Sequence, residues 1–267
     1  MESGHEYLPQ RAVFHGFVPL VMGTKLDLLA VGVEEKAALA LWDSMLEDAE
    51  ALHGMLNRFD PRSEVSRLNS ACDSGPVAVS DGLLELIGLC ERFRELSGGL
   101  FDVTRGSCGE GSVICGGGFV DLRGGSVDFG GVAKGYFLSR CRSLLLSDGV
   151  GCAYVDFGGS SILALGHHPF GDSWKISLTN PFAANGVATF DLVDCALSVS
   201  GNQPGYTGHI VNPLTGEQVE RKCLCAVLAP DPLAAEVAST AAVAGGRGCI
   251  DSLKAGLGVS EISYFSL

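Results

Sequence analysis

The sequence lacks two features that would each define a class of protein. It has no run of Lys and Arg, and 18 basic against 31 acidic residues give a net charge of −13, so it offers no basic patch for a nucleic-acid backbone. Its longest apolar stretches, such as 17–22 and 223–229, fall far short of the ~20 residues of a spanning helix. We therefore expect no nucleic-acid partner and no transmembrane segment.

Residues 1–11 also lack the basic start and apolar core of a secretory signal. We expect the protein as written to be cytoplasmic, and to be exported only if the printed sequence is a shortened form. The ten cysteines include no C-x-x-C pair, which argues against a zinc or iron–sulfur site. Reduced thiols that act as small buried apolar groups are the favoured interpretation.

Glycine, by contrast, is abundant and unevenly placed. The chain has 37 glycines, about twice the ordinary usage of ~7%. Thirteen of them fall among the 39 residues 97–135. Glycine permits tight turns and the close approach of a ligand to the backbone, so this region is the first candidate for a binding site.

The pattern of apolar residues predicts four helices: 34–58, a helix that starts at Ser80 or Asp81 and stops at Gly98-Gly99, 131–146 and 232–244. Helices cluster early and strands dominate the middle of the chain, which favours an α+β fold over a doubly wound sheet. No repeat or linker divides the chain, so we expect a single domain, 1–267. The predicted strands are 25–31, 126–129, 153–157, 161–165, 174–178, 187–193, 223–228 and 260–265.

One segment, 127–136, has the physical features of a phosphate site. A predicted strand leads through Gly130-Gly131 into a helix that carries Lys134 in its first turn. Such a turn presents backbone N–H groups and the positive end of the helix dipole to an anion. It matches neither the dinucleotide fingerprint nor the P-loop pattern, and glycines that only permit a turn are the alternative interpretation.

Two further segments carry chemistry-bearing side chains. His209 enters a predicted short strand that ends at an Asn-Pro turn, where a histidine is more often structural than catalytic. Glu236 and Thr240 lie four residues apart on one helix face, where a carboxylate and a hydroxyl offer oxygen ligands to a hard cation such as Mg²⁺. The alternative for Glu236 is a helix cap or a solvated side chain.

Taken in order, these segments resemble the ApbE family, flavin transferases that use FAD to attach FMN to a threonine or serine of another protein. The resemblance covers nearly the whole chain and implies an α+β fold with mixed, mainly antiparallel sheets and packed helices, related to the T-fold. The matching segments are 22–24, 59–69, 99–104, 128–136, 200–201, 209–216 and 235–240.

The resemblance also implies roles for individual residues of the flavin-nucleotide pocket. Met22 would line the pocket, and Phe59, where the family usually has tyrosine, would keep a stacking surface without the hydroxyl. The adenosine end would be held by Leu100, Phe101 and Asp102. Asp128 would be a further nucleotide contact.

For the transfer step, the resemblance implies a metal and two polar side chains. The metal ligands would be the Gly131 carbonyl, Glu236, which replaces the family's usual Asp, and Thr240. Lys134 would place positive charge against the diphosphate, and His209 would act in the transfer itself.

The implied reaction is attack of an acceptor hydroxyl on the FMN phosphorus of FAD, with AMP leaving and Mg²⁺ as cofactor. The implied partner is an acceptor flavoprotein with a Ser/Thr flavinylation motif, which this chain itself lacks; it also lacks the lipid-bearing cysteine of exported family members. Three alternatives remain open: a metal-dependent FAD pyrophosphatase that releases FMN and AMP, a non-catalytic flavin-binding module, and a structural protein with incidental glycines.

Overall fold

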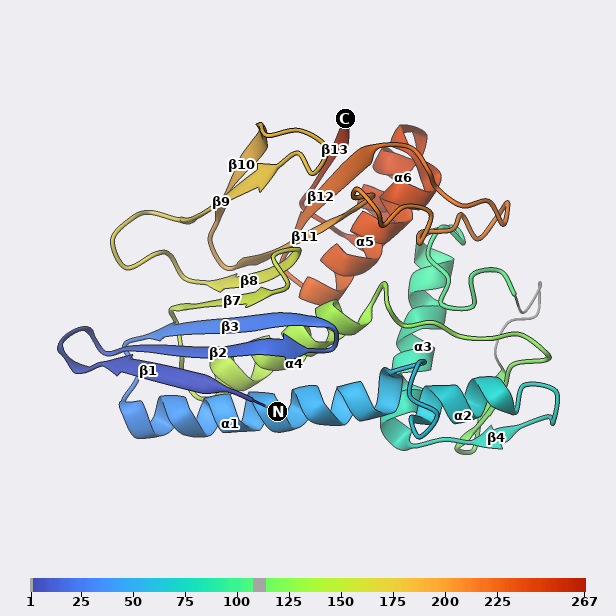
Figure 1. The fold of residues 1–267 in the computed structure, drawn as a ribbon, viewed down its shortest axis with the longest axis horizontal. Coiled ribbons are helices and arrows are strands. Elements are labelled where there is room, and N and C mark those ends of the chain that lie inside the picture. The colour runs from blue at the N-terminus through green and yellow to red at the C-terminus, as the bar shows by residue number, and fades with distance from the viewer. Residues whose placement is uncertain (1, 108–113) are drawn as a thin grey trace.

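A computed structural model describes residues 2–107 and 114–267, and its centre is an eight-stranded sheet (Figure 1). Every neighbouring pair of strands in this sheet is antiparallel. In spatial order the strands are β1 (Gly4–Leu8), β2 (Val13–Val21), β3 (Thr24–Val31), β7 (Ala153–Phe157), β8 (Ser161–Leu165), β11 (Cys195–Gly201), β12 (Cys223–Ala229) and β13 (Glu261–Ser266).

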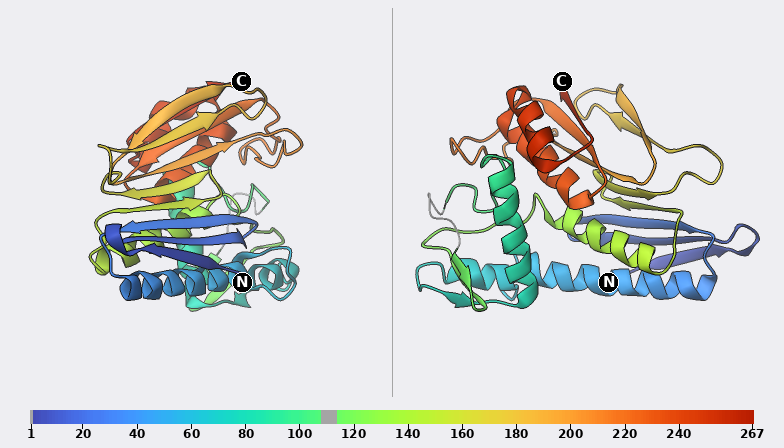
Figure 2. Two further views of the ribbon diagram at one scale, coloured as in Figure 1. Left: turned by 60° about the vertical axis from the view of Figure 1, so that its left-hand side comes forward. Right: turned by 180° about the vertical axis from the view of Figure 1, so that it is seen from behind.

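Three helices cover one face of this sheet: α1 (Glu35–Leu56), α4 (Ala133–Ser147) and α5 (Pro232–Gly245) (Figures 1 and 2). The apolar stripe of α1, which includes Trp42 and Met45, is buried against β2 and α4. Helix α5 is buried along most of its length between β11, β12 and α4, and its many alanines allow this close packing. A Cβ added at Gly135 of α4 would lie 2.6 Å from the Cβ of Glu236, so glycine is required where α4 meets α5.

The opposite face is partly covered by a hairpin of β9 (Trp174–Thr179) and β10 (Gly186–Leu192), which closes a second, smaller apolar cluster. The remaining elements lie toward one end of the molecule (Figure 2). They are the helices α2 (Glu64–Ser70), α3 (Asp81–Leu96) and α6 (Ile250–Leu257), and the small sheet of β4 (Val77–Ala78), β6 (Phe119–Asp121) and β5 (Ile114–Gly116). Short 3₁₀ turns follow β1 and α5 at Pro9–Arg11 and Arg247–Cys249.

The α+β prediction is confirmed, as are the four predicted helices and all predicted strands except 126–129. That segment forms no strand, because the Asn69 side chain takes the place of a neighbouring strand: its Nδ2 donates to the Val127 carbonyl at 2.9 Å and its Oδ1 accepts from the Val127 N–H at 2.8 Å. The predicted strand after His209 was also wrong, since only an isolated bridge joins Val211 to Gln218. The third helix begins at Ala133, two residues later than predicted, because Gly130–Val132 form a turn.

Within the described ranges 2–107 and 114–267, no helix combines the length and apolar character needed to cross a bilayer. The 22-residue helix α1 has the length but carries charged residues on its exposed side.

The cysteines whose side chains the structure describes are free thiols, and four of them, Cys90, Cys141, Cys223 and Cys225, are buried. Burial raises the pKa of the Cys225 thiol to about 12 and raises that of Cys141 well above its ordinary value. The Cys141 and Cys225 thiols are therefore protonated, unreactive packing groups. Cys108 lies outside the described residues.

Candidate functional site

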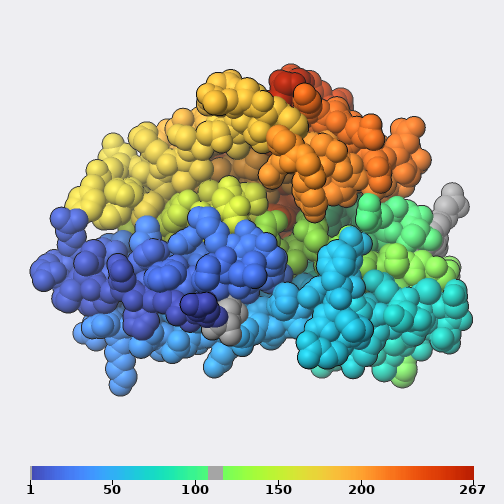
Figure 3. Space-filling model, viewed as in Figure 1, coloured from blue at the N-terminus to red at the C-terminus, as the bar shows by residue number. Residues whose placement is uncertain are grey.

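A cavity of about 620 Å³ brings most of the predicted site residues together. Figure 3 shows the surface hollowed between the cyan and the orange segments of the chain. The volume falls in the range of ~300–1,000 Å³ that is usual for small-molecule sites. The predicted residues that line it are Phe59, Leu100, Phe101, Asp102, Asp128, Gly131, Lys134, His209, Glu236 and Thr240.

Met22 is placed differently from the other predicted residues. It lies in the turn between β2 and β3 with a φ of 49°, and its half-buried side chain packs against the main core. It is outside the cavity lining that the described residues form.

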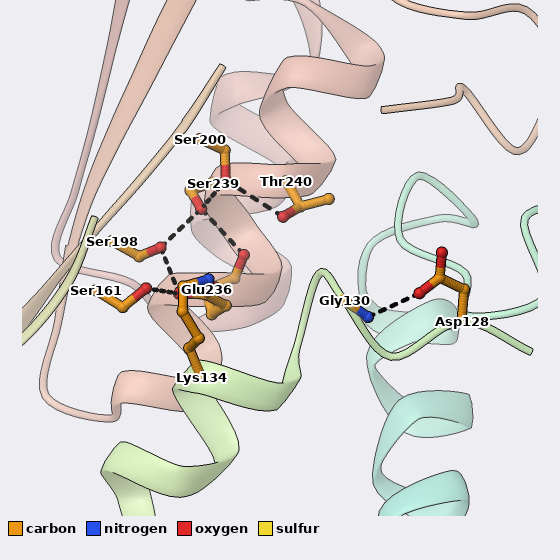
Figure 4. Close-up of polar contacts among 9 residues, drawn as sticks. All are labelled: Asp128, Gly130, Lys134, Ser161, Ser198, Ser200, Glu236, Ser239 and Thr240. Carbon is orange, nitrogen blue, oxygen red and sulfur yellow. Dashed lines mark hydrogen bonds and ion pairs between the residues drawn. The ribbon is translucent and has the colours of Figure 1, made fainter. Parts of the chain in front are cut away.

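At the cavity wall, the Glu236 carboxylate is buried and fully partnered (Figure 4). Lys134, in the first turn of α4, forms an ion pair with its Oε1. The hydroxyls of Ser161 on β8 and Ser198 on β11 donate to its Oε2 at 2.6 and 2.8 Å. Only 3% of Glu236 is exposed, so this pairing removes the large cost of an isolated buried charge. The alternative of a solvated glutamate was wrong.

From Glu236, a chain of hydroxyls leads to Thr240 (Figure 4). The Oγ of Ser239 lies 3.0 Å from that of Ser198 and 2.7 Å from that of Ser200, and Ser200 lies 3.3 Å from the Thr240 Oγ1. We did not predict the serines of this network. Two signals were available: Ser198 and Ser200 alternate on one face of a strand, and Ser239 lies one helical turn from Glu236.

The three predicted metal ligands, Gly131, Glu236 and Thr240, all line the cavity. No group of three or more His, Cys, Asp or Glu side chains in the described part of the chain could hold a metal ion. The predicted set is of another kind, a carbonyl, a hydroxyl and one carboxylate, and oxygen ligands of this sort suit Mg²⁺. Gly131 and Thr240 are neighbours, since a Cβ at Gly131 would lie 3.6 Å from Thr240 Oγ1. The chemistry of these three ligands therefore suits Mg²⁺, and one Glu236 oxygen is in contact with the ammonium of Lys134.

Across the cavity, Asp128 braces the glycine turn that precedes α4. Its Oδ1 accepts from the Gly130 N–H at 2.9 Å, and its Oδ2 lies 3.0 Å from Nη1 of Arg58 and 3.7 Å from Nη1 of Arg105. Asp102 braces the neighbouring loop by accepting from the Thr104 N–H at 2.8 Å. We did not predict the two arginines as site residues.

The ring of His209 is half-buried and stacks on Tyr206, with ring centroids 4.1 Å apart. Burial lowers the pKa of His209, the Tyr206 backbone opposes this shift, and the charge of Arg105 adds to the lowering. Its buried Nδ1 has no hydrogen-bond partner among the described residues. A buried ring nitrogen without a partner counts against the interpretation as a satisfied structural histidine.

Phe59 marks the mouth of the cavity. Its side chain is 81% exposed, and the guanidinium carbon of Arg58 lies 4.7 Å from its ring centre. An exposed aromatic ring over a cavity mouth provides a stacking surface for a planar ligand. Phe101, by contrast, is buried in the main core while still contributing to the lining.

The fold places the glycine turn that precedes α4, Lys134 and the half-buried His209 around one cavity. The model of the ApbE family matches residues 22–112 and 116–256. The chain belongs to the ApbE family.

The chain is also similar to curated proteins and to solved structures of ApbE proteins. The FAD:protein FMN transferase of Klebsiella pneumoniae (strain 342) is 23% identical over 259 residues, covering 80% of this chain and 74% of the relative. That of Chlamydia pneumoniae is 26% identical over 243 residues, covering 76% and 72%. The solved structure of the ApbE protein from Thermotoga maritima matches with a TM-score of 0.80 at 21% identity, over 94% of this chain and 96% of that one. The apo flavinyl transferase ApbE of Pseudomonas stutzeri matches with a TM-score of 0.79 at 20% identity, over 95% and 94%.

Proposed function

We propose that this protein transfers FMN from FAD to a Ser or Thr hydroxyl of an acceptor protein and releases AMP. The observation that carries the proposal is the meeting of the glycine turn at α4, Lys134, His209 and the Glu236–Thr240 face in one cavity. Two curated relatives that share most of their length with this chain are named for this reaction.

The cavity must attract a dianionic diphosphate into a protein of net charge −13. The N-terminal end of α4 supplies a positive dipole end, and the ammonium of Lys134, which is paired with Glu236, lies beside it. These preorganised groups reverse the sign of the field locally, which both binds the diphosphate and stabilises charge that develops during transfer.

The transfer itself forms one bond and breaks one. The acceptor oxygen bonds to the FMN phosphorus, while the bond from that phosphorus to the bridging oxygen breaks and AMP leaves with this oxygen. The acceptor proton passes to His209, whose lowered pKa keeps the ring neutral and able to accept it. Tyr206 holds the ring in position by stacking.

The metal of this site is proposed to be Mg²⁺, held by the Gly131 carbonyl, the Glu236 carboxylate and the Thr240 hydroxyl. Bound there, Mg²⁺ supplies neutralisation of the diphosphate charge. The hydroxyls of Ser161 and Ser198 keep the Glu236 carboxylate oriented. Lys134 would have to share or release its carboxylate oxygen on metal binding.

The test is incubation with FAD, MgCl₂ and a peptide carrying an acid, a Ser or Thr, small residues and an Ala-Thr pair. We expect a mass increase of one FMN on the peptide and an equal amount of AMP. Glu236→Ala should abolish transfer, and His209→Ala should slow it by roughly 10²–10⁴-fold. Glu35→Ala, an exposed residue at the start of α1, is the matched control and should be fully active.

Two other outcomes would overturn the proposal. Free FMN and AMP with an unmodified peptide would mean that the protein is an FAD pyrophosphatase. Bound FAD with no AMP release would mean a non-catalytic flavin-binding module. Full activity of Glu236→Ala would refute the metal assignment alone.

A further inference from the structure

Arg105 lines the cavity but lies in a stretch, 105–125, that matches no motif in the sequence. Its backbone is left-handed, with a φ of 56°, and Gly106 follows with a φ of 78°. A non-glycine residue avoids this conformation unless its surroundings impose it, and such residues gather at functional sites.

The loop around Arg105 is fixed by its own hydrogen bonds. The Arg105 N–H donates to the Asp102 carbonyl at 3.0 Å, and the Ser107 N–H donates to the Thr104 carbonyl at 3.0 Å. Gly106 abuts the segment after His209, since a Cβ there would lie 2.7 Å from the Pro213 carbonyl oxygen. Arg105 is thus held at the junction between the Asp102 loop and the segment that carries His209.

Arg105 is also the least neutralised of the three cationic side chains that line the cavity within the described chain. Lys134 pairs with Glu236, and Arg58 lies 3.0 Å from Asp128. Arg105 lies 3.7 Å from the same Asp128 oxygen, beyond hydrogen-bond distance, and 37% of its side chain is exposed. Its donors are therefore available to an anion in the cavity.

We propose that Arg105 binds a phosphate of the substrate, on the side of the cavity between the glycine turn of α4 and His209. A guanidinium offers paired N–H donors whose spacing matches two phosphate oxygens, which a lysine cannot reproduce. The assignment rests on the proposed function, because FAD supplies the phosphates. It adds a residue for substrate recognition that lies outside every segment on which the family resemblance was based.

The test measures dissociation constants of FAD, FMN and riboflavin for the full chain by flavin fluorescence. Arg105→Met should weaken the binding of FAD and FMN by roughly tenfold or more, which corresponds to the loss of a charged hydrogen bond. The affinity for riboflavin should not change. The FAD and FMN affinities of Arg105→Lys should lie between those of the wild type and Arg105→Met. Arg105→Gly keeps the left-handed turn without strain and should lose FAD and FMN affinity to the same extent, which separates lost recognition from misfolding.

The matched control is Arg123→Met. Arg123 has the same backbone, with a φ of 49° and a following glycine, but is outside the cavity lining that the described residues form. The Arg123→Met variant should bind FAD, FMN and riboflavin with the affinities of the wild type. FAD affinity of Arg105→Met within twofold of the wild type, or an equal loss for riboflavin, would overturn the assignment. If the wild type binds no flavin nucleotide, the proposed function fails as well; if it transfers FMN while Arg105→Met binds FAD normally, only this assignment fails.

Discussion

Replacement of Lys134 by Met should destabilise the folded protein, because it leaves the Glu236 carboxylate buried without a counterion. The Glu236 side chain is 5% exposed and that of Lys134 is 23% exposed, so water screens the pair little. Methionine preserves the length and apolar stem of the lysine, so the packing of α4 against α5 should survive. The change therefore isolates the lost charge.

The magnitude follows from the contacts that remain. Removing one partner of a buried ion pair costs about 3–5 kcal/mol. Ser161 and Ser198 still donate to the carboxylate at 2.6 and 2.8 Å, which places the expected loss at the lower end, about 3 kcal/mol. For a chain of this size that loss lowers the melting temperature by roughly 6–12 °C.

The assay is urea unfolding of four proteins: wild type, Lys134→Met, Glu236→Gln and the double variant. The double variant removes both charges, so its loss should be smaller than the sum of the single losses by about 2 kcal/mol. Lys175→Met, in the exposed pair with Asp191, is the control and should unfold like the wild type. Additive losses, or a Lys134→Met variant as stable as the wild type, would refute the reasoning.

Further predictions concern other parts of the molecule. Because burial lowers the pKa of His209 below 6.5, its contribution to stability is present above pH 6.5 and is lost as the pH falls toward its folded value; His209→Phe should flatten the free energy of unfolding measured across this range, and an unchanged slope would contradict the shift. Gly135→Ala places a Cβ 2.6 Å from that of Glu236 and should cost about 1–3 kcal/mol by urea unfolding, whereas Gly88→Ala on α3 meets nothing within 4 Å and should cost nothing. The buried thiol of Cys141 should react with an alkylating reagent only in denaturant, as mass spectrometry of the labelled peptide would report; rapid labelling of the native protein would count against its burial.

Four helices were predictable because their signals are local, whereas the short helices α2 and α6 were missed. Helix α3 begins one residue after Ser80, whose hydroxyl accepts from the Leu83 N–H as an N-cap, and it ends just before Gly98-Gly99. The apolar stripe of α1 has the helical period over its whole length. Caps and periodicity act within a few residues, so the sequence contains them in full.

The strand errors have the opposite cause. β11 was missed because it is buried while carrying serines inward, so it lacks the apolar pattern of a core strand. Segment 126–129 has strand composition, but its hydrogen bonds are taken by Asn69, 58 residues earlier in the chain. A segment forms a strand only when neighbouring segments supply its hydrogen bonds and packing surface. The sequence of the strand alone does not specify those neighbours.

By itself, the sequence determined the α+β class, four of the six α-helices in the described chain, and the segments that line the cavity. These segments are the glycine turn, His209, and Glu236 with Thr240 on one helix face. Only the tertiary structure decided how these groups are partnered. It joined Glu236 to Lys134, 102 residues away, and to Ser161, 75 residues away, and it placed Arg105 at the cavity wall. Such contacts depend on sheet register and on how closely α4 approaches α5, which arise only when distant segments pack together.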